Sequence, residues 1–273
     1  MNSQKFISLR DGAAAAVAEP VLALKTSLTF EIAKRWRAGS LSVRSPLDRL
    51  PPDRPGRPER PELVSPRAVA KRSLHTPAGR VALLHALAHI ELNAIDLALD
   101  IIARFAGQTL PSSFFDGWVR VAADEARHFT LLSERLADLG AAYGDLPAHD
   151  GLWQAAHNTR TDLHARLAVV PLILEARGLD VTPSLMDAMQ KTGDHRSAAV
   201  LSVIYADEKH HVAIGAKWFR FFCARERQDP ARRFQELVRT NFRGEVKPPF
   251  NDLARAAAGL TPSFYRSLSS ISA

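Results

Sequence analysis

The sequence predicts an all-α protein built around an antiparallel bundle of four long helices. Apolar residues recur with the 3.6-residue period of a helix in four ranges, 76–106, 112–140, 152–178 and 195–226. Segments with Gly, Pro, Asp and Thr separate these ranges, and no run of alternating polar and apolar residues demands a sheet. Long helices joined by short connections pack against one another as a bundle, here over residues 76–226.

The N-terminal segment, residues 1–75, is predicted to contain one helix and a strap. Residues 12–37 have helical periodicity, with Pro20 near the start, and residues 45–66 (SPLDRLPPDRPGRPERPELVSP) are too rich in Pro to form a regular helix or a central strand. The apolar residues of the helix need a surface to cover, so we expect the Pro/Arg-rich strap to pack on the core. A flexible linker is the alternative.

The end of the chain is predicted to add short helices. Thr182 and Pro183 have the character of an N-cap and a first helical residue, which predicts a short helix over about 184–192 between the third and fourth long helices. Residues 227–273 form a C-terminal helical extension, with a helix near 230–242 and a last piece that starts at Thr261-Pro262.

Composition favours a protein of the cytoplasm. Cys223 is the only cysteine, which excludes a disulfide within the chain and a Cys-based zinc ribbon. The apolar stretch near the N-terminus is short and is followed by Glu19 and Pro20, so no signal peptide is predicted. No window reaches the roughly 18 apolar residues of a membrane span.

The basic charge is concentrated in the N-terminal segment. Residues 1–75 carry 14 Lys and Arg against 7 Asp and Glu, and this excess of +7 equals the formal charge of the whole chain. Basic ends of this kind bind nucleic acid, an acidic carrier protein or the acidic middle of the same chain. The last reading is favoured.

Two similar segments carry the residues of a candidate metal site. Residues 119–132 (VRVAADEARHFTLL) and 202–215 (SVIYADEKHHVAIG) both contain Ala-Asp-Glu-x-x-His. At 100° per residue, Glu91, Glu125 and Glu208 each fall in an apolar stripe that faces the bundle core. A buried charge without a partner costs several kcal/mol, which predicts a compensating partner for each carboxylate.

Metal ions are the simplest compensation for these charges. Glu91, Glu125-x-x-His128, Glu175 and Glu208-x-x-His211 give one Glu on each of two helices and a Glu-x-x-His on each of the other two, the pattern of di-iron and di-manganese bundles. The spacings of 34 residues from Glu91 to Glu125 and 33 from Glu175 to Glu208 let the chain leave the site, turn and return. A buried Glu/His hydrogen-bond network without metal is the alternative.

The same residues resemble the ferritin-like di-iron carboxylate superfamily and, more closely, a bacterial ferritin-like family of unknown function. The resemblance rests on the segments HALAHIEL (85–92), AADEARHF (122–129), AYGDLPAHDGLW (142–153), LEARGLDVTP (174–183) and DEKHHVAIG (207–215). It implies a ferritin-like bundle in which Glu125 and Glu208 bridge two metals. Glu91 and His128 would complete one metal site, and Glu175 and His211 the other.

The resemblance also implies supporting residues around the ligands. In related di-iron enzymes an Asp that precedes a bridging Glu accepts the second N–H of a metal-bound His, so Asp124 and Asp207 are expected in this role. Arg127 is similar to the Arg that pairs with these groups in acyl-carrier-protein desaturases, and a surface position is its alternative.

The expected function is oxygen chemistry at two metal ions. Carboxylates with imidazoles suit iron, the expected metal, and also manganese or a mixed pair. We expect an O2-activating hydroxylase, desaturase or oxidase that acts on a small or carrier-bound substrate with a separate electron donor. A non-catalytic or ferroxidase-type iron protein and a transfer-RNA hydroxylase are the alternatives. We expect a monomer or dimer rather than a ferritin cage, no membrane partner, and no nucleic acid as the leading partner.

Overall fold

The computed structural model describes residues 6–68 and 73–269, which divide into two compact units, Met1–Trp153 and Gln154–Ala273. All regular structure within these described ranges is helical, apart from two isolated bridges, Leu63 with Ala148 and Val246 with Ser269. The prediction of an all-α protein is confirmed.

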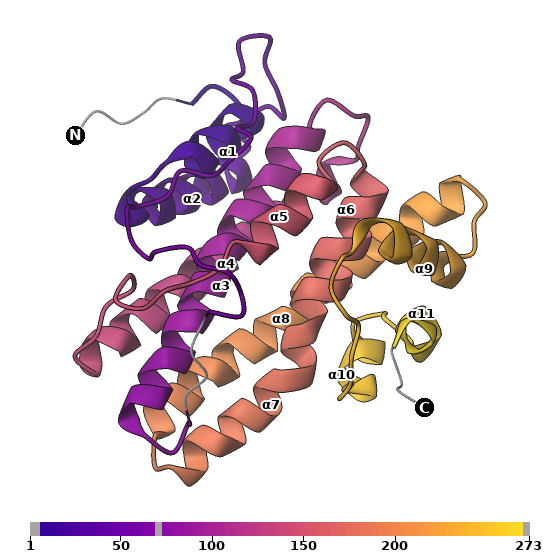
Figure 1. The fold of residues 1–273 in the computed structure, drawn as a ribbon. Helices are drawn as coiled ribbons and strands as arrows, with labels where there is room; N and C mark the ends of the chain where they lie inside the picture. The colour runs from indigo at the N-terminus through magenta and orange to yellow at the C-terminus, as the bar shows by residue number, and fades with distance from the viewer. Residues whose placement is uncertain (1–5, 69–72, 270–273) are drawn as a thin grey trace. The chain divides into compact units, whose positions relative to one another are not determined.

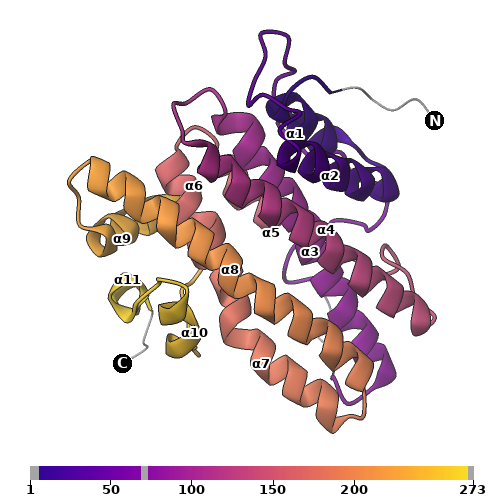
Figure 2. The ribbon, with the colours of Figure 1, turned by 180° about the vertical axis from the view of Figure 1, so that it is seen from behind.

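The first unit is built on two long helices, α3 and α4, which lie side by side (Figures 1 and 2). Two shorter N-terminal helices cover them, with α1 packed on α3 and α2 on α4. Thr76 caps α3 by accepting a hydrogen bond from the Gly79 amide at 3.0 Å, which fixes the start of that helix. The helices are α1 (Leu9–Ala18), α2 (Leu22–Arg37), α3 (Pro77–Phe105), α4 (Ser112–Asp138) and the beginning of α5 (Gly151–Asn158).

The N-terminal helix predicted over residues 12–37 is wrong as a single element, because the chain forms two helices with a break before Pro20. Glu19, the residue before the proline, is extended at φ −73° and ψ 118°, as the proline ring favours. Lys25 of α2 then donates to the carbonyls of Ala16 and Val17 at 3.1 and 3.0 Å. These carbonyls belong to the last turn of α1, so a buried lysine caps that helix.

The Pro/Arg-rich strap lies against the first unit through specific polar contacts. The Arg57 guanidinium donates to the Asn93 side chain at 2.5 Å and lies 3.3 Å from Asp150. The Gly56 amide donates to the Val17 carbonyl at 2.8 Å, and the indole N–H of Trp153 donates to the Asp53 carbonyl at 3.2 Å. Arg57 of the strap therefore binds side chains of the same unit.

The second unit places two long helical segments side by side (Figures 1 and 2). One is a continuous run of α6, the π-helix η1 and α7, and the other is α8. Shorter helices follow at the C-terminal end. The elements are α6 (Leu163–Val169), η1 (Val170–Glu175), α7 (Ala176–Lys191), α8 (His195–Arg225), α9 (Pro230–Asn241), α10 (Asp252–Ala257), α11 (Pro262–Tyr265) and η2 (Arg266–Leu268).

The boundaries predicted between residues 152 and 192 are wrong. The chain stops being helical after Asn158, and Asp162 starts α6 by accepting from the Ala165 amide at 3.0 Å. Pro183, predicted to begin a separate helix, lies inside α7. A proline cannot donate to the carbonyl four residues back, but here the side-chain amide of Asn251 donates to that Leu179 carbonyl at 3.2 Å. The helix can therefore continue.

The C-terminal extension is fastened to α7 by a buried ion pair. Both oxygens of Asp180 accept from the Arg255 guanidinium, each at 2.7 Å, and both side chains are buried. The Asn251 amide donates to the same carboxylate at 2.9 Å. Such fork-to-fork geometry fixes orientation as well as distance. The predicted helices near 230–242 and after Thr261 are confirmed as α9 and α11.

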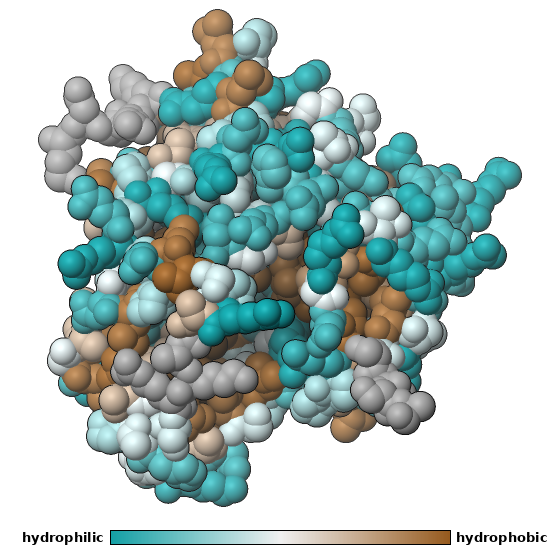
Figure 3. Space-filling view, viewed as in Figure 1, coloured by the Kyte–Doolittle hydropathy of each residue, from teal (hydrophilic) through white to brown (hydrophobic). Residues whose placement is uncertain are grey.

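Within the described part of the chain, no helix combines the length and apolar character needed to cross a membrane. The face drawn in Figure 3 is mainly hydrophilic, with hydrophobic residues visible between the polar ones.

Candidate metal centre

Three of the predicted ligands come together in the first unit. Glu91 of α3 and Glu125 of α4 each place a carboxylate oxygen 3.2 Å from the Nδ1 atom of His128. All three residues are almost completely buried: 3% of the Glu91 surface is exposed, and none of Glu125 or His128. One ligand atom from each residue lies within 4.8 Å of the others, so the group could hold a metal ion.

Helix periodicity puts this polar group inside an apolar layer. Glu125 and His128 lie one turn apart on α4, and Glu91 meets them from the neighbouring helix α3. Fully buried apolar residues precede and follow them on the same helix faces. These are Leu84, Ala88 and Ile95 on α3, and Trp118, Val121 and Leu132 on α4. Water is therefore kept from the group by its own helices.

Burial changes the protonation of the group. Removal from water, with the Glu125 charge next to it, raises the pKa of Glu91 to about 8. Burial alone would lower the pKa of His128, but the hydrogen bonds and charges of Glu125 and Glu91 raise it to about 11. These protein groups therefore hold protons at neutral pH that a cation would replace.

Two further predicted ligands lie on α8 of the second unit. Glu208 and His211 are buried, at 7% and 0% exposure, and the Glu208 carboxylate lies 4.0 Å from His211 Nδ1. The Glu208 side chain runs past Gly178 of α7, where an added Cβ would lie 3.8 Å from its Cγ and Cδ atoms. The α7 backbone therefore lies close to the Glu208 side chain, at a distance where an alanine would also fit.

Glu175, the remaining predicted ligand, is the last residue of the π-helix η1, which lies between α6 and α7. It is half-buried at the junction of η1 with α7, and η1 packs on α8. Pro171 in η1 comes so close to α8 that a Cβ at Gly215 would lie 2.5 Å from the proline Cβ. A short π-helical stretch widens a helix locally and often occurs at functional sites.

The residues expected to support the ligands are less buried. Asp124 is half-buried and pairs with Arg127 at 3.5 Å and with Arg120 at 3.7 Å. Arg127 is exposed, so the structure places it at the surface while keeping it beside Asp124. Asp207 is half-buried on α8.

A second polar cluster on α3 has structural partners. Asp96 of α3 forms a buried ion pair with Lys25 of α2. His89 contacts the Tyr143 hydroxyl at 2.8 Å and the His149 carbonyl at 3.0 Å, and burial lowers its pKa to about 4. His85 accepts from the Gly144 amide at 3.0 Å. The cluster therefore fastens α2 and the loop after α4 to α3.

Sequence reasoning missed two glycines at which the helices of the second unit approach each other. Gly178 lies three residues after Glu175, and Gly215 lies four after His211, so each is one helical turn from a predicted ligand. A glycine one turn from a predicted ligand could have indicated close packing of the helices there. The close approach of Pro171 and Glu208 to these glycines depends on how α7 and η1 pack on α8, which no local pattern specifies.

Comparisons with known proteins identify a family without a known activity. Residues 18–266 match the family described as "Protein of unknown function (DUF455)". A relative from Haemophilus influenzae, described as an uncharacterized protein, is 42% identical over 211 residues, which cover 75% of this chain and 73% of the relative. No solved structure matches the chain significantly.

Proposed function

The chain belongs to this family of unknown function, and from its own residues we propose that it is a dimetal carboxylate protein that oxidises an organic substrate with O2. Glu91, Glu125 and His128 would form one half of the centre, and Glu175, Glu208 and His211 the other. In this proposal α3, α4, the α6–η1–α7 segment and α8 form a ferritin-like four-helix bundle around one pair of ions.

One observation carries the proposal: Glu91, Glu125 and His128 are buried together, with ligand atoms within 4.8 Å. The donor set fits Fe(II), which we favour, and also Mn(II), because hard carboxylates and imidazole suit both. A bound pair of iron ions would supply the electrons that reduce O2. The protein would hold the ions and exclude water with the apolar layers of α3 and α4, and His128 and Glu91 would release their protons when the ions bind.

The substrate is proposed to be a small or carrier-bound organic molecule, with electrons from a separate donor. The transfer-RNA alternative depends on a free basic arm. However, Arg49 pairs with Asp11, Arg57 with Asp150 and Arg104 with the Pro52 carbonyl, so arginines in and around the strap have partners within the first unit. This observation favours a strap that serves the fold.

The first test is metal stoichiometry. We expect about two iron ions for each chain after anaerobic loading with Fe(II), measured by elemental analysis. Glu125→Ala removes a ligand and should reduce the content by at least one ion. Glu134→Ala is the matched control, since Glu134 is an exposed Glu on the same helix, and it should keep the full content. Equal metal content in all three proteins, or none in the wild type, would contradict the proposal.

The second test separates an oxygenase from an iron-oxidising protein. Fe(II)-loaded protein is mixed with O2 in a stopped-flow spectrometer, and then challenged with a tenfold excess of Fe(II). We expect one oxidation event for each centre, with further turnover only when an external reductant is added. Continuous oxidation of the excess Fe(II) would instead establish a ferroxidase, and absence of any O2 reaction would leave a metal-binding protein.

A further inference from the structure

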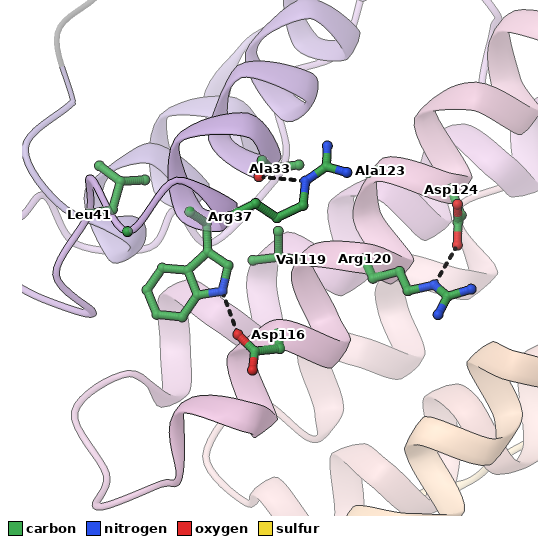
Figure 4. Close-up of a pocket in the computed structure, with 10 residues that line it drawn as sticks. Ala33, Arg37, Leu41, Asp116, Val119, Arg120, Ala123 and Asp124 are labelled. Carbon is green, nitrogen blue, oxygen red and sulfur yellow. Dashed lines mark hydrogen bonds and ion pairs between the residues drawn. The ribbon is translucent and has the colours of Figure 1, made fainter.

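A hollow of about 730 Å³ lies between α2 and α4 in the first unit. Figure 4 shows its lining residues, which come from the end of α2, the turn after it and the first half of α4. At 100° per residue, Asp116, Val119 and Ala123 lie roughly 180°, 120° and 160° around α4 from Glu125. The hollow is therefore on the opposite side of this helix from Glu91, Glu125 and His128.

The hollow has an apolar, fixed interior. Ala33, Leu41 and Val119 line it and are themselves buried. The Trp36 ring is held by its indole N–H, which donates to Asp116 at 2.8 Å, and by an edge-on contact with Phe115. A preformed apolar wall of this kind loses little conformational entropy when a ligand binds. The volume is also within the usual range for small-molecule sites.

The charges around the hollow leave one cation available. Arg37 uses Nε to donate to the Ala33 carbonyl at 3.1 Å, and its guanidinium extends from α2 toward α4 (Figure 4). Within the described residues no carboxylate forms an ion pair with Arg37. The two acidic groups of the lining have partners, since Asp116 accepts from Trp36 and Asp124 pairs with Arg120. The two arginines and two aspartates of the lining sum to zero, and Arg37 is the arginine that lies in no ion pair within the described residues, so it is the group that can bind a carboxylate.

We propose that this hollow binds a small amphipathic carboxylate. The apolar body of the ligand lies over Val119 against the Trp36 ring, and its carboxylate accepts hydrogen bonds from the terminal nitrogens of Arg37. Bidentate binding of a carboxylate by a guanidinium gives both orientation and affinity. None of the six proposed metal ligands lines the hollow, although Asp124, an expected supporting residue of that centre, does, so the hollow accommodates an additional ligand of this protein.

The ligand chemistry is tested with three probes in isothermal titration calorimetry. Octanoate has both the chain and the carboxylate, octan-1-ol has the chain alone, and acetate has the carboxylate alone. We expect octanoate to bind at least tenfold more tightly than either partial probe, because only octanoate has both the chain that packs on the apolar wall and the carboxylate that binds Arg37. No octanoate binding, or equally tight binding of octan-1-ol, would overturn the proposal.

Two variants locate the binding site. Arg37→Gln removes the available cation and should weaken octanoate binding at least tenfold, whereas Lys34→Gln removes the same charge from an exposed position on the same helix and should leave binding unchanged. Equal weakening by both variants would show a general charge effect and overturn the proposal. Ala123→Phe, which fills the hollow from α4, should abolish binding with an unchanged circular dichroism spectrum. Retained binding in that variant would place octanoate elsewhere.

Discussion

His128 lies between two carboxylates, and in the proposed metal centre this position would link proton binding to metal binding. The pKa of His128 is raised to about 11 by Glu125 and Glu91, and that of Glu91 is raised to about 8 by burial and by Glu125. A metal ligand must be deprotonated, so an ion has to displace these protons. Both pKa values lie above neutrality, which makes the direction of the pH effect unambiguous.

We predict that Mn(II) binding releases protons and strengthens as pH rises from 6 to 8. Below the two pKa values each released proton changes the apparent affinity about tenfold per pH unit. Calorimetry in buffers with different ionisation enthalpies measures the number of protons released. His128→Gln, which cannot hold the proton, should reduce that number by about one. Affinity that is independent of pH would contradict the ligand assignment.

The buried group of Glu91, Glu125 and His128 could be predicted from the sequence, because a Glu-x-x-His pair in an apolar helix stripe needs a compensating partner. The Lys25–Asp96 pair shows the limit of that reasoning. Lys25 pairs with Asp96 and also caps α1, and this cap exists only because the helix is interrupted at Pro20. The apolar periodicity of α1 does not predict that a lysine of the following helix will cap it.

At the scale of elements, α3, α4 and α8 were predictable because each has a long apolar stripe, and α3 and α8 also have a capping residue at the start. Thr76 precedes α3 and Asp194 caps α8 by accepting from the Ser197 amide at 3.0 Å. The course of α7 was not predictable. The helix continues through Pro183 because the Asn251 side chain donates to the Leu179 carbonyl, and these two residues are 72 positions apart in the sequence. A hydrogen bond between residues so far apart in the sequence cannot be predicted from the residues around Pro183.

The packing of η1 on α8 leads to a prediction about Gly215. A Cβ at this position would lie 2.5 and 2.6 Å from two ring atoms of Pro171, which cannot rotate away. Gly215→Ala should therefore force η1 and α8 apart and lower the free energy of unfolding by about 1–3 kcal/mol, as overpacked sites do. Urea unfolding measures this change.

Gly107→Ala is the matched control for Gly215→Ala, since a Cβ at Gly107 would meet no heavy atom within 4 Å. It should change the free energy of unfolding by less than about 0.5 kcal/mol, the usual range for surface substitutions. If Gly215→Ala is equally neutral, the close contact between η1 and α8 does not exist in solution. Reduced metal content in Gly215→Ala alone would further connect this contact with the ligands on α8.

At the scale of the whole molecule, the predicted segments and the compact units divide the chain differently. The sequence suggested boundaries near residues 75 and 226, where composition changes. The units meet at Trp153 and Gln154, within α5. Contacts define a unit, and α1, α2 and the strap contact α3, α4 and the loop after α4. Three predicted ligands, Glu91, Glu125 and His128, therefore belong to the first unit. The other three, Glu175, Glu208 and His211, belong to the second.

This division makes the proposed common centre testable by hydrogen exchange. If one pair of ions is shared, loading with Mn(II) should slow amide exchange in α4 and in α8, because a ligand suppresses local opening of every element that binds it. Glu125→Ala changes only the first unit, yet it should weaken the metal-dependent protection of α8 in the second. Glu134→Ala should leave both effects intact. Full protection of α8 in Glu125→Ala would show that the two halves bind metal independently, and the ferritin-like arrangement would then have to be abandoned.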